Sequence, residues 1–428
     1  MKRKRPGKTL LVFSQPFVPD PASVGQHIAD ATMELARRGR RVVVIASDRG
    51  YDDPTKRYPR RENIGGVEIK RVPFTSFGKS RGYLRALGAL VFMVRCLADG
   101  LFRRDLGAIL FLTSPPFIGA VAALLGKVRR CPIAYWTMDI NPDQLIVLGK
   151  IRPHGIAAKV LGAVNDFVLR EATLVVALDR FMRERLNQRG NFSAKTIVIP
   201  PWPHEDSLEP VPAADNPFRA RHGLQDKIVI MYSGNHSPSN PLTTLLDAAV
   251  YYKKDPRLEF VFVGSGTGKK QVEDYMAEHS LRNVLSLPYQ PLRELRFSLS
   301  AADVHVVSLG NGMTGIIHPC KIYGAMSVAR PILYFGPPSS HIADLLQAHD
   351  IGWQVPHGDI TGAIKAIDTI RTASRESLEK KGRAAQQVIR QSLDQTRLRN
   401  QFCDEIERRL LDSPVPVPGG VNTPNFAG

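Results

Sequence analysis

Residues 8–47 read KTLLVFSQPFVPDPASVGQHIADATMELARRGRRVVVIAS, and their pattern indicates the fold class. A short apolar run at 8–13 is followed by a proline-rich loop, and a helical pattern then continues as far as Gly39. A second apolar run covers 41–47. A strand, a helix and a second strand in this order form the unit of a parallel sheet. The sequence therefore predicts an α/β protein.

The same alternation recurs along the rest of the chain. The apolar runs that we expect to form further strands lie at 108–112, 132–139, 172–179, 195–201, 227–234, 258–266, 283–288, 304–310 and 331–337. A proline-rich, acidic stretch at 202–218 separates two series of such runs, and a long helical pattern near 373–411 closes the fold. Because 428 residues exceed one comfortable core, we predict two doubly wound domains that bind ligands at the carboxyl ends of their strands.

The net charge of +18 is distributed unevenly along the chain. Residues 1–200 contain 34 Lys and Arg against 16 Asp and Glu, whereas residues 201–428 contain 24 of each. An excess confined to the first half predicts a polyanionic partner for that half, either nucleic acid or an anionic membrane face. The sequence contains no zinc-finger spacing and no RNA-binding signature, so we expect no nucleic-acid partner.

Several features point to a cytoplasmic protein without a metal centre. We find neither a signal peptide nor an apolar window of about 18 residues, the length that spans a membrane. The four cysteines are scattered with no CxxC spacing, which is typical of a reducing compartment. Cys320 lies near His318, but no second Cys/His pair is close in sequence. We therefore predict no metal site.

The stretch GSGTGKK at 264–270 is close to two phosphate-binding fingerprints and completes neither. A dinucleotide fingerprint needs glycine where Lys269 stands, and a P-loop needs glycine and Ser/Thr where Val263 and Lys270 stand. A tight glycine turn remains, and Gly266 within it is a candidate for contact with a phosphate ligand. No DxD pair and no GxSxG elbow occur anywhere in the chain.

Three ordered motifs resemble the colanic-acid (WbuB) type branch of glycosyltransferase family 4. The first, TSPPFIGAVAALLGKVRRCPIAYWTMDINPDQLIVLG at 113–149, contains the Asp-Ile-Asn-Pro-Asp version of a family motif at 139–143. The second, NPFRARHGLQDKIVIMYSGNHSPSNPLTTLLDAA at 216–249, is similar to the family's entry into its second domain. The third, HPCKIYGAMSVARP at 318–331, is similar to the family's Pro-x-Lys-x-Tyr-(Gly/Glu) motif.

The resemblance implies a GT-B fold, in which two Rossmann-like domains face each other across a cleft. It implies an acceptor-side domain at 8–205, a nucleotide-sugar-binding domain at 206–394 and a final segment, 395–411, that packs back on the first domain. Residues 412–428 remain as a tail whose composition is typical of disorder. The implied reaction is the retaining transfer of a sugar from a nucleotide-sugar co-substrate, with a UDP-sugar as the expected donor and with neither cofactor nor essential metal.

Lys321 is the first candidate for a catalytic role. A departing diphosphate needs positive potential, which helix N-termini, backbone amides and lysine supply where no metal does. Lys321 opens a helical pattern at 321–329, and a cation at that end of a helix is unfavourable unless an anion binds there. His318 and Tyr323 are weaker candidates for donor binding, since a loop histidine also caps helices and a helical tyrosine also packs in cores.

Two pairs of positions depart from the family pattern. Ile316 and Gly324 stand where many members carry the two glutamates of an E-x7-E motif, so donor contacts near Gly324 must come from the backbone or from other residues. Asn235 and Asn240 stand where many relatives place Arg and Lys for the diphosphate.

The glycine before Asn235 keeps a phosphate-binding role possible for this loop. Gly234 permits a close approach of phosphate, and Asn235 or His236 is able to donate hydrogen bonds to it. An ordinary turn is an equally good reading of Asn235.

In the first domain, Gly25 and Asp139 are candidates. Gly25 is expected in a strand-to-helix loop whose backbone amides face the phosphates. Asp139 ends the predicted strand 132–139 at the sheet edge where ligands bind, and it is expected to orient the acceptor hydroxyl or to help move its proton. The alternative role of Asp139 is to cap the helix that follows.

The segment 83–104 combines apolar clusters with arginines, as an interfacial amphipathic helix does. Together with the basic residues at 1–5 and 57–62 it suggests peripheral docking on an anionic membrane leaflet and a lipid-linked or glycan acceptor. The alternative is an ordinary core helix with a solvated basic face. Two other functions stay open from sequence: a GT-B nucleotide-sugar epimerase and a non-catalytic partner in polysaccharide assembly.

Overall fold

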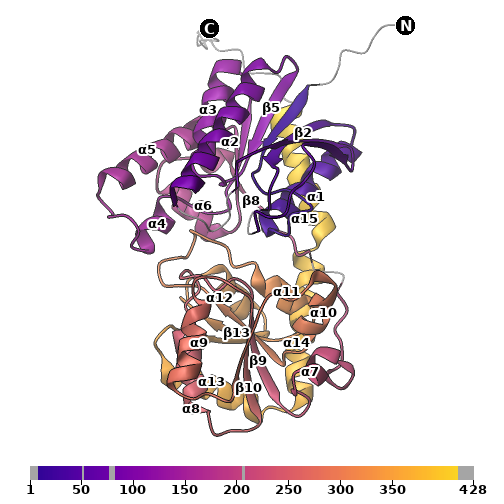
Figure 1. The fold of residues 1–428 in the computed structure, drawn as a ribbon, viewed down its shortest axis with the longest axis vertical. Coiled ribbons are helices and arrows are strands. Elements are labelled where there is room, and N and C mark those ends of the chain that lie inside the picture. Colours follow the sequence, from indigo (N-terminus) through magenta and orange to yellow (C-terminus); the bar gives the residue numbers. More distant parts are fainter. Residues whose placement is uncertain (1–7, 51–52, 77–81, 205–207, 413–428) are drawn as a thin grey trace, which may run out of the picture.

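The computed structural model describes residues 8–50, 53–76, 82–204 and 208–412, which form two α/β domains stacked along the long axis of the molecule (Figure 1). The N-terminal domain contains an eight-stranded sheet and the C-terminal domain a six-stranded sheet. The predicted fold class, two doubly wound α/β domains, is confirmed. The basic residues 1–5 and the tail from 413 onward, for which docking and disorder were predicted, lie outside the described residues.

The N-terminal sheet has the strand order β3-β4-β2-β1-β5-β6-β7-β8. Neighbouring strands are parallel, except that β3 and β4 form an antiparallel hairpin at one edge. The strands are β1 (Thr9–Phe13), β2 (Arg41–Ser47), β3 (Arg61–Ile64), β4 (Val67–Val72), β5 (Leu106–Phe111), β6 (Ile133–Trp136), β7 (Leu174–Ala177) and β8 (Thr196–Val198). The central strands are almost wholly buried, because helices cover both faces of the sheet.

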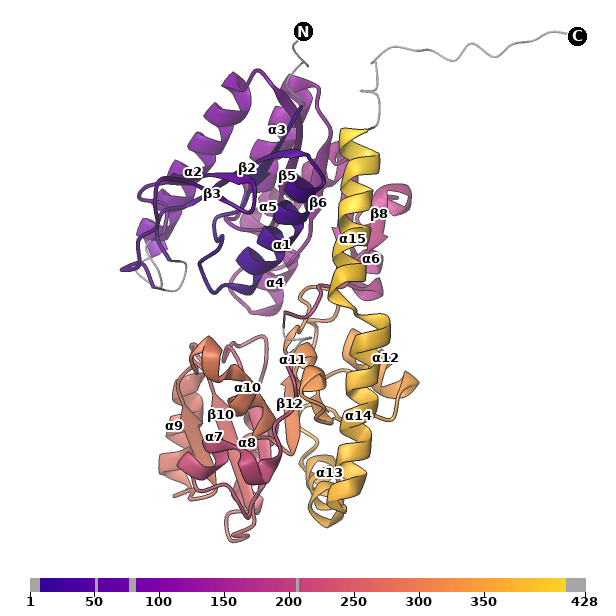
Figure 2. The ribbon, with the colours of Figure 1, turned by 90° about the vertical axis from the view of Figure 1, so that its right-hand side faces the viewer.

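Two groups of helices cover this sheet. On one side α2, α3 and α5 pack in a row, and on the other α1 packs against the last helix of the chain, α15 (Figures 1 and 2). The helices of the N-terminal domain are α1 (Ser23–Arg37), α2 (Gly82–Phe102), α3 (Ile118–Arg129), α4 (Asp143–Val147), α5 (Ile156–Glu171) and α6 (Arg180–Asn187). None of the helices in the described part of the chain is long and apolar enough to cross a membrane.

The C-terminal sheet is parallel throughout and has the order β11-β10-β9-β12-β13-β14. Its strands are β9 (Ile228–Ser233), β10 (Leu258–Val263), β11 (Val284–Leu287), β12 (Val304–Ser308), β13 (Ile332–Phe335) and β14 (Gly352–Val355). Its helices are α7 (Pro217–Arg221), α8 (Thr243–Tyr251), α9 (Lys269–Glu278), α10 (Leu295–Ser300), α11 (Lys321–Ser327), α12 (His341–Ala348) and α13 (Ile360–Thr372).

The long helix predicted near 373–411 is interrupted. The structure has α14 (Arg375–Ser392) on the C-terminal domain and α15 (Gln395–Ile406) on the N-terminal domain, followed by a π-helical turn (Figure 2). Asp394 lies at the break, and its carboxylate caps α15 by accepting a hydrogen bond from the backbone N–H of Arg397 at 2.6 Å. The break lets the chain change direction as it crosses back to the first domain.

Several contacts join the two domains near the carboxyl ends of their strands. The backbone of Asp139, just after β6, forms an antiparallel bridge with Ile317, which follows β12. The N–H of Ile140 donates to the carbonyl of Ile316 at 2.9 Å. The loops that carry the predicted site residues of both domains therefore meet at the domain boundary.

Candidate active site

Lys321 is the first residue of α11, and its side chain reaches the loop that follows β9. Its ammonium group donates hydrogen bonds to the hydroxyl of Tyr232 at 2.5 Å and to the carbonyl of Asn235 at 3.0 Å. No carboxylate in the described residues lies within ion-pairing distance of it. Burial lowers the pKa of Lys321 to about 7. The site thus holds a cation that lacks an opposite charge, which an anionic ligand is able to supply.

Gly234 makes this arrangement possible. Its φ is +140°, and a Cβ atom at this position would lie 2.3 Å from Cε of Lys321. The space that the sequence assigned to a phosphate is therefore occupied in this structure by the lysine side chain itself. Gly234 lies in the predicted loop, but the group that its missing side chain lets come close is the side chain of Lys321.

The glycine turn after β10 packs against the same loop. A Cβ atom on Gly266, whose φ is +139°, would lie 2.3 Å from the carbonyl oxygen of His236 and 2.5 Å from Oδ1 of Asn235. The N–H of His236 donates to the carbonyl of Ser265 at 2.8 Å. Because Gly266 has no side chain, the turn after β10 lies in contact with the loop after β9 that surrounds Lys321.

The two asparagines of this loop differ in their surroundings. Asn235 is exposed, so its amide is available to a ligand in addition to the carbonyl that Lys321 uses. Asn240 points toward Lys321: in the amide orientation that satisfies both of its polar atoms, it donates to the carbonyl of Ser308 and accepts from the lysine Nζ at 3.3 Å. The loop therefore surrounds Lys321 with neutral oxygen acceptors.

His236 is 1% exposed and lies edge-on to the ring of Tyr232, with ring centroids 5.1 Å apart. Burial, and next the positive charges of Lys269 and Lys321, lower the pKa of His236 to about 4, so the imidazole is neutral at pH 7. In the described part of the molecule neither ring nitrogen has a hydrogen-bond partner. The side chain is buried under the loop, and His236 lines a pocket together with Asn240, Thr267 and Gly268.

His318 and Tyr323, which were predicted to bind the donor, have their polar atoms paired with neighbouring side chains. Both side chains are buried in a polar network that joins the domains. Nδ1 of His318 lies 2.8 Å from the carboxylate of Asp179, and its Nε2 lies 2.7 Å from the hydroxyl of Tyr323, which is also 3.4 Å from Nε2 of His341.

The electrostatics of this network agree with a structural role. Burial by itself would raise the pKa of Asp179, but the hydrogen bond and charge of His318 outweigh it and the pKa falls. Burial, and next the charge of His318, lower the pKa of His341 to about 3. Asp179 also caps α6 by accepting from the N–H of Met182. These groups therefore join the two domains through a buried network.

Gly324 and Gly25 are placed differently from the sequence prediction. Gly324 is buried inside α11, where an added Cβ would make an ordinary contact, 3.4 Å from Leu299. Ile316, the other position that lacks a glutamate, is fully buried. Gly25 lies within the first turn of α1 and not in the loop before it, and a Cβ atom added there would lie 3.2 Å from the backbone nitrogen of Phe17. Both glycines are buried where they lie in their helices.

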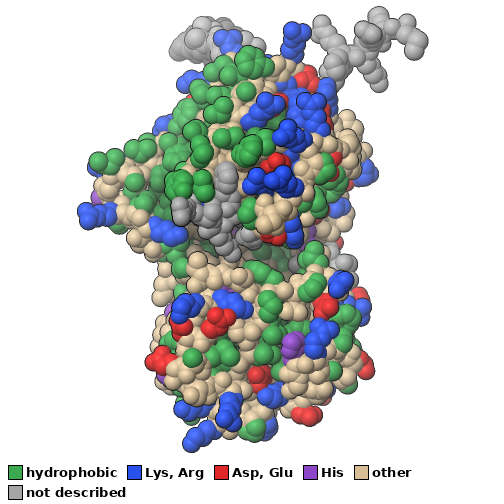
Figure 3. All heavy atoms as spheres, viewed as in Figure 1, with side chains coloured by type: hydrophobic (Ala, Val, Ile, Leu, Met, Phe, Trp, Pro, Cys, Tyr) green, Lys and Arg blue, Asp and Glu red, His purple; other side chains and the backbone are tan. Residues whose placement is uncertain are grey.

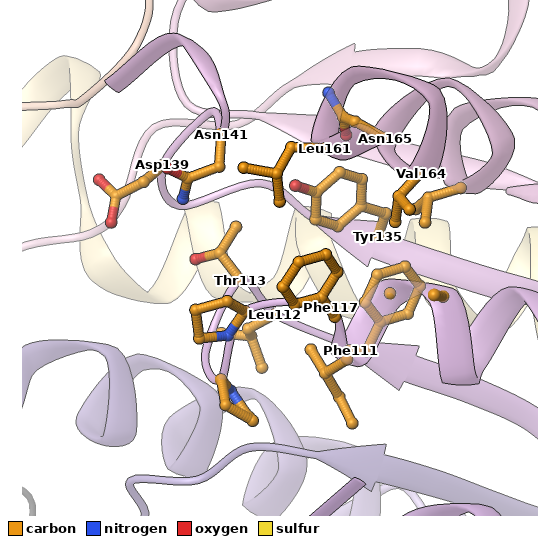
Figure 4. A pocket seen from close by; sticks show the side chains of 16 residues that line it. Phe111, Leu112, Thr113, Phe117, Tyr135, Asp139, Asn141, Leu161, Val164 and Asn165 are labelled. Atoms are coloured by element: carbon orange, nitrogen blue, oxygen red, sulfur yellow. The ribbon is translucent and has the colours of Figure 1, made fainter. Parts of the chain in front are cut away.

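Asp139 lies at the mouth of an apolar slot in the N-terminal domain (Figure 4). It does not cap the following helix, since α4 begins after Pro142 without a side-chain cap. In the described residues its carboxylate has no hydrogen-bond partner, and burial raises its pKa to about 6. A carboxylate with this pKa is ionised for the most part at neutral pH and is well matched to accept a proton.

Sequence reasoning missed the walls of this slot. The rings of Phe111 and Tyr135 stack in parallel with centroids 5.0 Å apart, and Leu161 and Val164 of α5 close the other side. Phe117 lies at the edge, 44% exposed, with the uncommon φ of +70°. The Ser-Pro-Pro-Phe turn was visible in the sequence, but the contribution of α5, some 45 residues away, was not.

The slot has the composition of a small-molecule site. Its walls are mainly apolar, and a few polar groups converge on it. Two of these, Oδ1 of Asn141 and Nδ2 of Asn165, are buried and have no partner in the described structure. Unpaired buried amides cost free energy, so they favour a polar ligand or water at this position.

Comparison with known families covers most of the chain. Residues 23–202 match the glycosyl transferase 4-like domain, and residues 215–388 match glycosyl transferases group 1. The chain is 26% identical over 336 residues to the probable glycosyltransferase WbjE of Pseudomonas aeruginosa, covering 78% of this chain and 82% of that protein. It is 23% identical over 415 residues to the putative colanic acid biosynthesis glycosyl transferase WcaI of Escherichia coli K12, covering 93% and 99%.

Solved structures show the same fold. Anabaena Alr3699/HepE in complex with UDP and glucose superposes with a TM-score of 0.70 at 15% identity, covering 94% of this chain and all of that one. Sucrose-phosphate synthase from Thermosynechococcus elongatus gives a TM-score of 0.72 at 16% identity, covering 94% and 98%. Neither the epimerase nor the non-catalytic alternative is supported by these matches. The chain belongs to glycosyltransferase family 4, and it is a glycosyltransferase with the GT-B fold.

Proposed function

We propose that this glycosyltransferase moves a sugar from a UDP-sugar to a lipid-linked glycan acceptor during the assembly of a cell-surface polysaccharide. The observation that carries the proposal is that a lysine and a carboxylate, neither with an ion-pair partner among the described residues, lie on segments that the domain boundary joins. Lys321 belongs to the C-terminal domain and Asp139 to the N-terminal domain, and the Asp139–Ile317 bridge holds their loops together.

Lys321 acts on the donor. As the bond between the sugar and the diphosphate breaks, negative charge grows on the leaving oxygen, and the ammonium group stabilises that charge. Tyr232 and the carbonyl of Asn235 hold the ammonium in place before the donor arrives. Binding of the diphosphate raises the pKa of the lysine again, because the anion favours the protonated form.

Asp139 acts on the acceptor. The acceptor hydroxyl forms the new bond to the anomeric carbon, and Asp139 orients that hydroxyl while its proton passes to the carboxylate or to the leaving phosphate oxygen. In the retaining, same-face route that we propose, entering and leaving oxygens lie on one side of the sugar. The route needs no protein nucleophile, and the described residues of the site offer no second carboxylate beside Asp139.

Two findings support UDP-sugar as donor and a polysaccharide precursor as acceptor. Anabaena Alr3699/HepE, which shares the fold, is described with UDP and with UDP-glucose. The relative WcaI is named for colanic acid biosynthesis. The apolar slot beside Asp139 suits an acceptor that carries a nonpolar part next to its reacting sugar.

The surface of the N-terminal domain supports a membrane location for this acceptor. Helix α2 exposes apolar side chains in helical register, including Leu87, Leu90, Val94 and Phe102, which are 52%, 53%, 57% and 83% exposed. Figure 3 shows the broad apolar area over this domain, with basic side chains beside it. An ordinary core helix would bury this stripe, so the arrangement favours docking on an anionic leaflet.

A calorimetric screen of UDP- and GDP-sugars against the full chain tests the donor assignment. We expect one UDP-sugar to bind, and Lys321→Ala to weaken its affinity at least tenfold while leaving the melting temperature within a few degrees. Binding of GDP-sugars alone would contradict the UDP assignment. Equal affinity of the variant would contradict the role of Lys321.

A further inference from the structure

A second basic site lies away from the active site, in a groove between the β3–β4 hairpin and α2. The groove has a volume of about 800 Å³, which is in the range of ligand-binding pockets. One wall is apolar and consists of Leu90 and Val94 of α2 together with Phe74, which is 59% exposed. The other wall is formed by the hairpin and is cationic.

The cationic wall contains a pair of like charges that face each other. Arg61 and Lys70 are directly opposite in the antiparallel register of β3 and β4. Side chains opposite each other in such a pair lie on the same face with Cβ atoms about 5 Å apart, and like charges there are destabilising. A pair of this kind is tolerated more easily when an anion binds between the two groups.

The basic residues that line the groove outnumber the carboxylates around it. Asp99, the one carboxylate that lines it in the described structure, lies 3.2 Å from Lys70, 3.2 Å from Arg95 and 3.8 Å from Arg103, so three cations share its charge. Glu68 lies 3.9 Å from Lys70 and offsets part of that residue's charge. Glu62 forms an ion pair with the buried Arg71. Arg60 and Arg61 are exposed, and neither has a carboxylate partner in the described residues.

We infer that this groove binds the headgroup and the first part of an acyl chain of one anionic phospholipid. Arg60, Arg61 and Lys70 would contact the phosphate, and Leu90 and Val94 the chain. The apolar wall continues into the exposed stripe of α2, which places the groove at the edge of the surface that we propose to face the membrane. The inference rests on that proposed location. It adds a site for one lipid molecule to the general electrostatic attraction between the basic domain and an anionic membrane.

Monomeric short-chain lipid separates these two possibilities. Dihexanoylphosphatidylglycerol, used below its critical micelle concentration, presents no surface, so a diffuse attraction gives no saturable binding. We expect the full chain to bind it with one-to-one stoichiometry in calorimetry, and to bind dihexanoylphosphatidylcholine at least tenfold more weakly. Glycerol phosphate, which lacks the acyl chains, is expected to bind more weakly as well. Equal affinity for glycerol phosphate would assign a free-phosphate site and would overturn the lipid assignment.

Matched variants locate the site. The double variant Arg60→Gln with Arg61→Gln is expected to weaken binding roughly 25-fold, since each cation near an anionic lipid contributes about fivefold. Lys253→Gln with Lys254→Gln removes the same charge from exposed positions of the C-terminal domain and is expected to change affinity less than twofold. Absence of saturable binding, or equal losses in the two variants, would overturn the inference.

These experiments test the proposed function and the proposed lipid site independently of each other. Donor binding is measured on the same variants without lipid, and both double variants are expected to keep the wild-type affinity for the UDP-sugar. A chain that binds donor but no monomeric lipid would refute the groove and leave the transferase assignment intact.

Discussion

Asp139 and Ile317 form an antiparallel backbone bridge across the domain boundary. Ile317 lies four residues before Lys321, so this single contact brings the proposed acceptor-side carboxylate and the proposed donor-side lysine to the same part of the molecule. The bridge involves only backbone atoms, so no pattern of side chains in the sequence predicts it.

Replacement of Asp139 by Asn separates chemistry from donor binding. The amide retains the shape of the side chain but does not accept a proton, so we expect kcat to fall about 10²- to 10⁴-fold. The affinity for the UDP-sugar is expected to stay within twofold, because Asp139 belongs to the acceptor domain. Steady-state kinetics and calorimetry measure the two quantities, and a parallel loss of donor affinity would contradict the assignment.

The pH dependence of kcat/KM carries a signature of the same residue. Burial raises the pKa of Asp139 to about 6, and its ionised form is the one that accepts a proton. At saturating donor, kcat/KM for the acceptor is therefore expected to rise with pH and to level off above about 6. This acid limb should be absent in Asp139→Asn; if it persists there, another group titrates in the reaction.

Donor binding is expected to take up a proton above neutral pH. The pKa of Lys321 is about 7 in the free enzyme, so at pH 8 the lysine is mostly neutral and must gain a proton to meet the diphosphate. Affinity should weaken up to about tenfold per pH unit above pH 7. Calorimetry in two buffers with different ionisation enthalpies counts the protons, and Lys321→Met should abolish the uptake.

Two tyrosines near α11 provide a matched comparison. Tyr323→Phe removes the hydroxyl that pairs with His318, and we expect it to lower the free energy of unfolding by about 1–3 kcal/mol while donor affinity is unchanged. Tyr232→Phe removes the hydroxyl that positions Lys321, and we expect weaker donor binding. Urea denaturation and calorimetry on both variants test this contrast. If Tyr323→Phe weakened donor binding and left the free energy of unfolding unchanged, Tyr323 would belong to the donor-binding site.

Vesicle flotation tests the apolar stripe of α2. The double variant Leu87→Gln with Val94→Gln is expected to lose most of the binding to phosphatidylglycerol vesicles at low salt, because it removes exposed apolar area from the docking face. Leu292→Gln changes a 69% exposed leucine of the C-terminal domain and serves as control. If the wild-type chain does not float with anionic vesicles, the membrane proposal is wrong.

Much of the fold was predictable because local patterns specify it. Buried parallel strands such as β1 and β2 are continuous apolar runs, and Gly39 ends the helical pattern between them. The β3–β4 hairpin was not predicted, since its short strands at the edge of the sheet carry charged residues such as Arg61 and Lys70. The break at Asp394 was missed because both halves of the segment are helical by themselves.

The site was predictable only in part. Lys321 was identified from its place at a helix start, a local feature of the sequence. The burial of His318 and Tyr323 depends on Asp179, some 140 residues away, and no local pattern reveals it. The slot beside Asp139 likewise needs α3 and α5 to meet. Tertiary contacts thus decide which polar residues of a motif face a ligand.

The measurement closest to the central claim is sugar transfer by the purified chain from a UDP-sugar to a polyprenyl-diphosphate-linked glycan, with the anomeric configuration of the product read by NMR. We predict a lipid-linked product in which the donor configuration is retained, at least 10²-fold less of it with Lys321→Ala, and as large a loss with Asp139→Asn. An inverted product, or transfer that proceeds at the wild-type rate in both variants, would contradict the proposed site and mechanism.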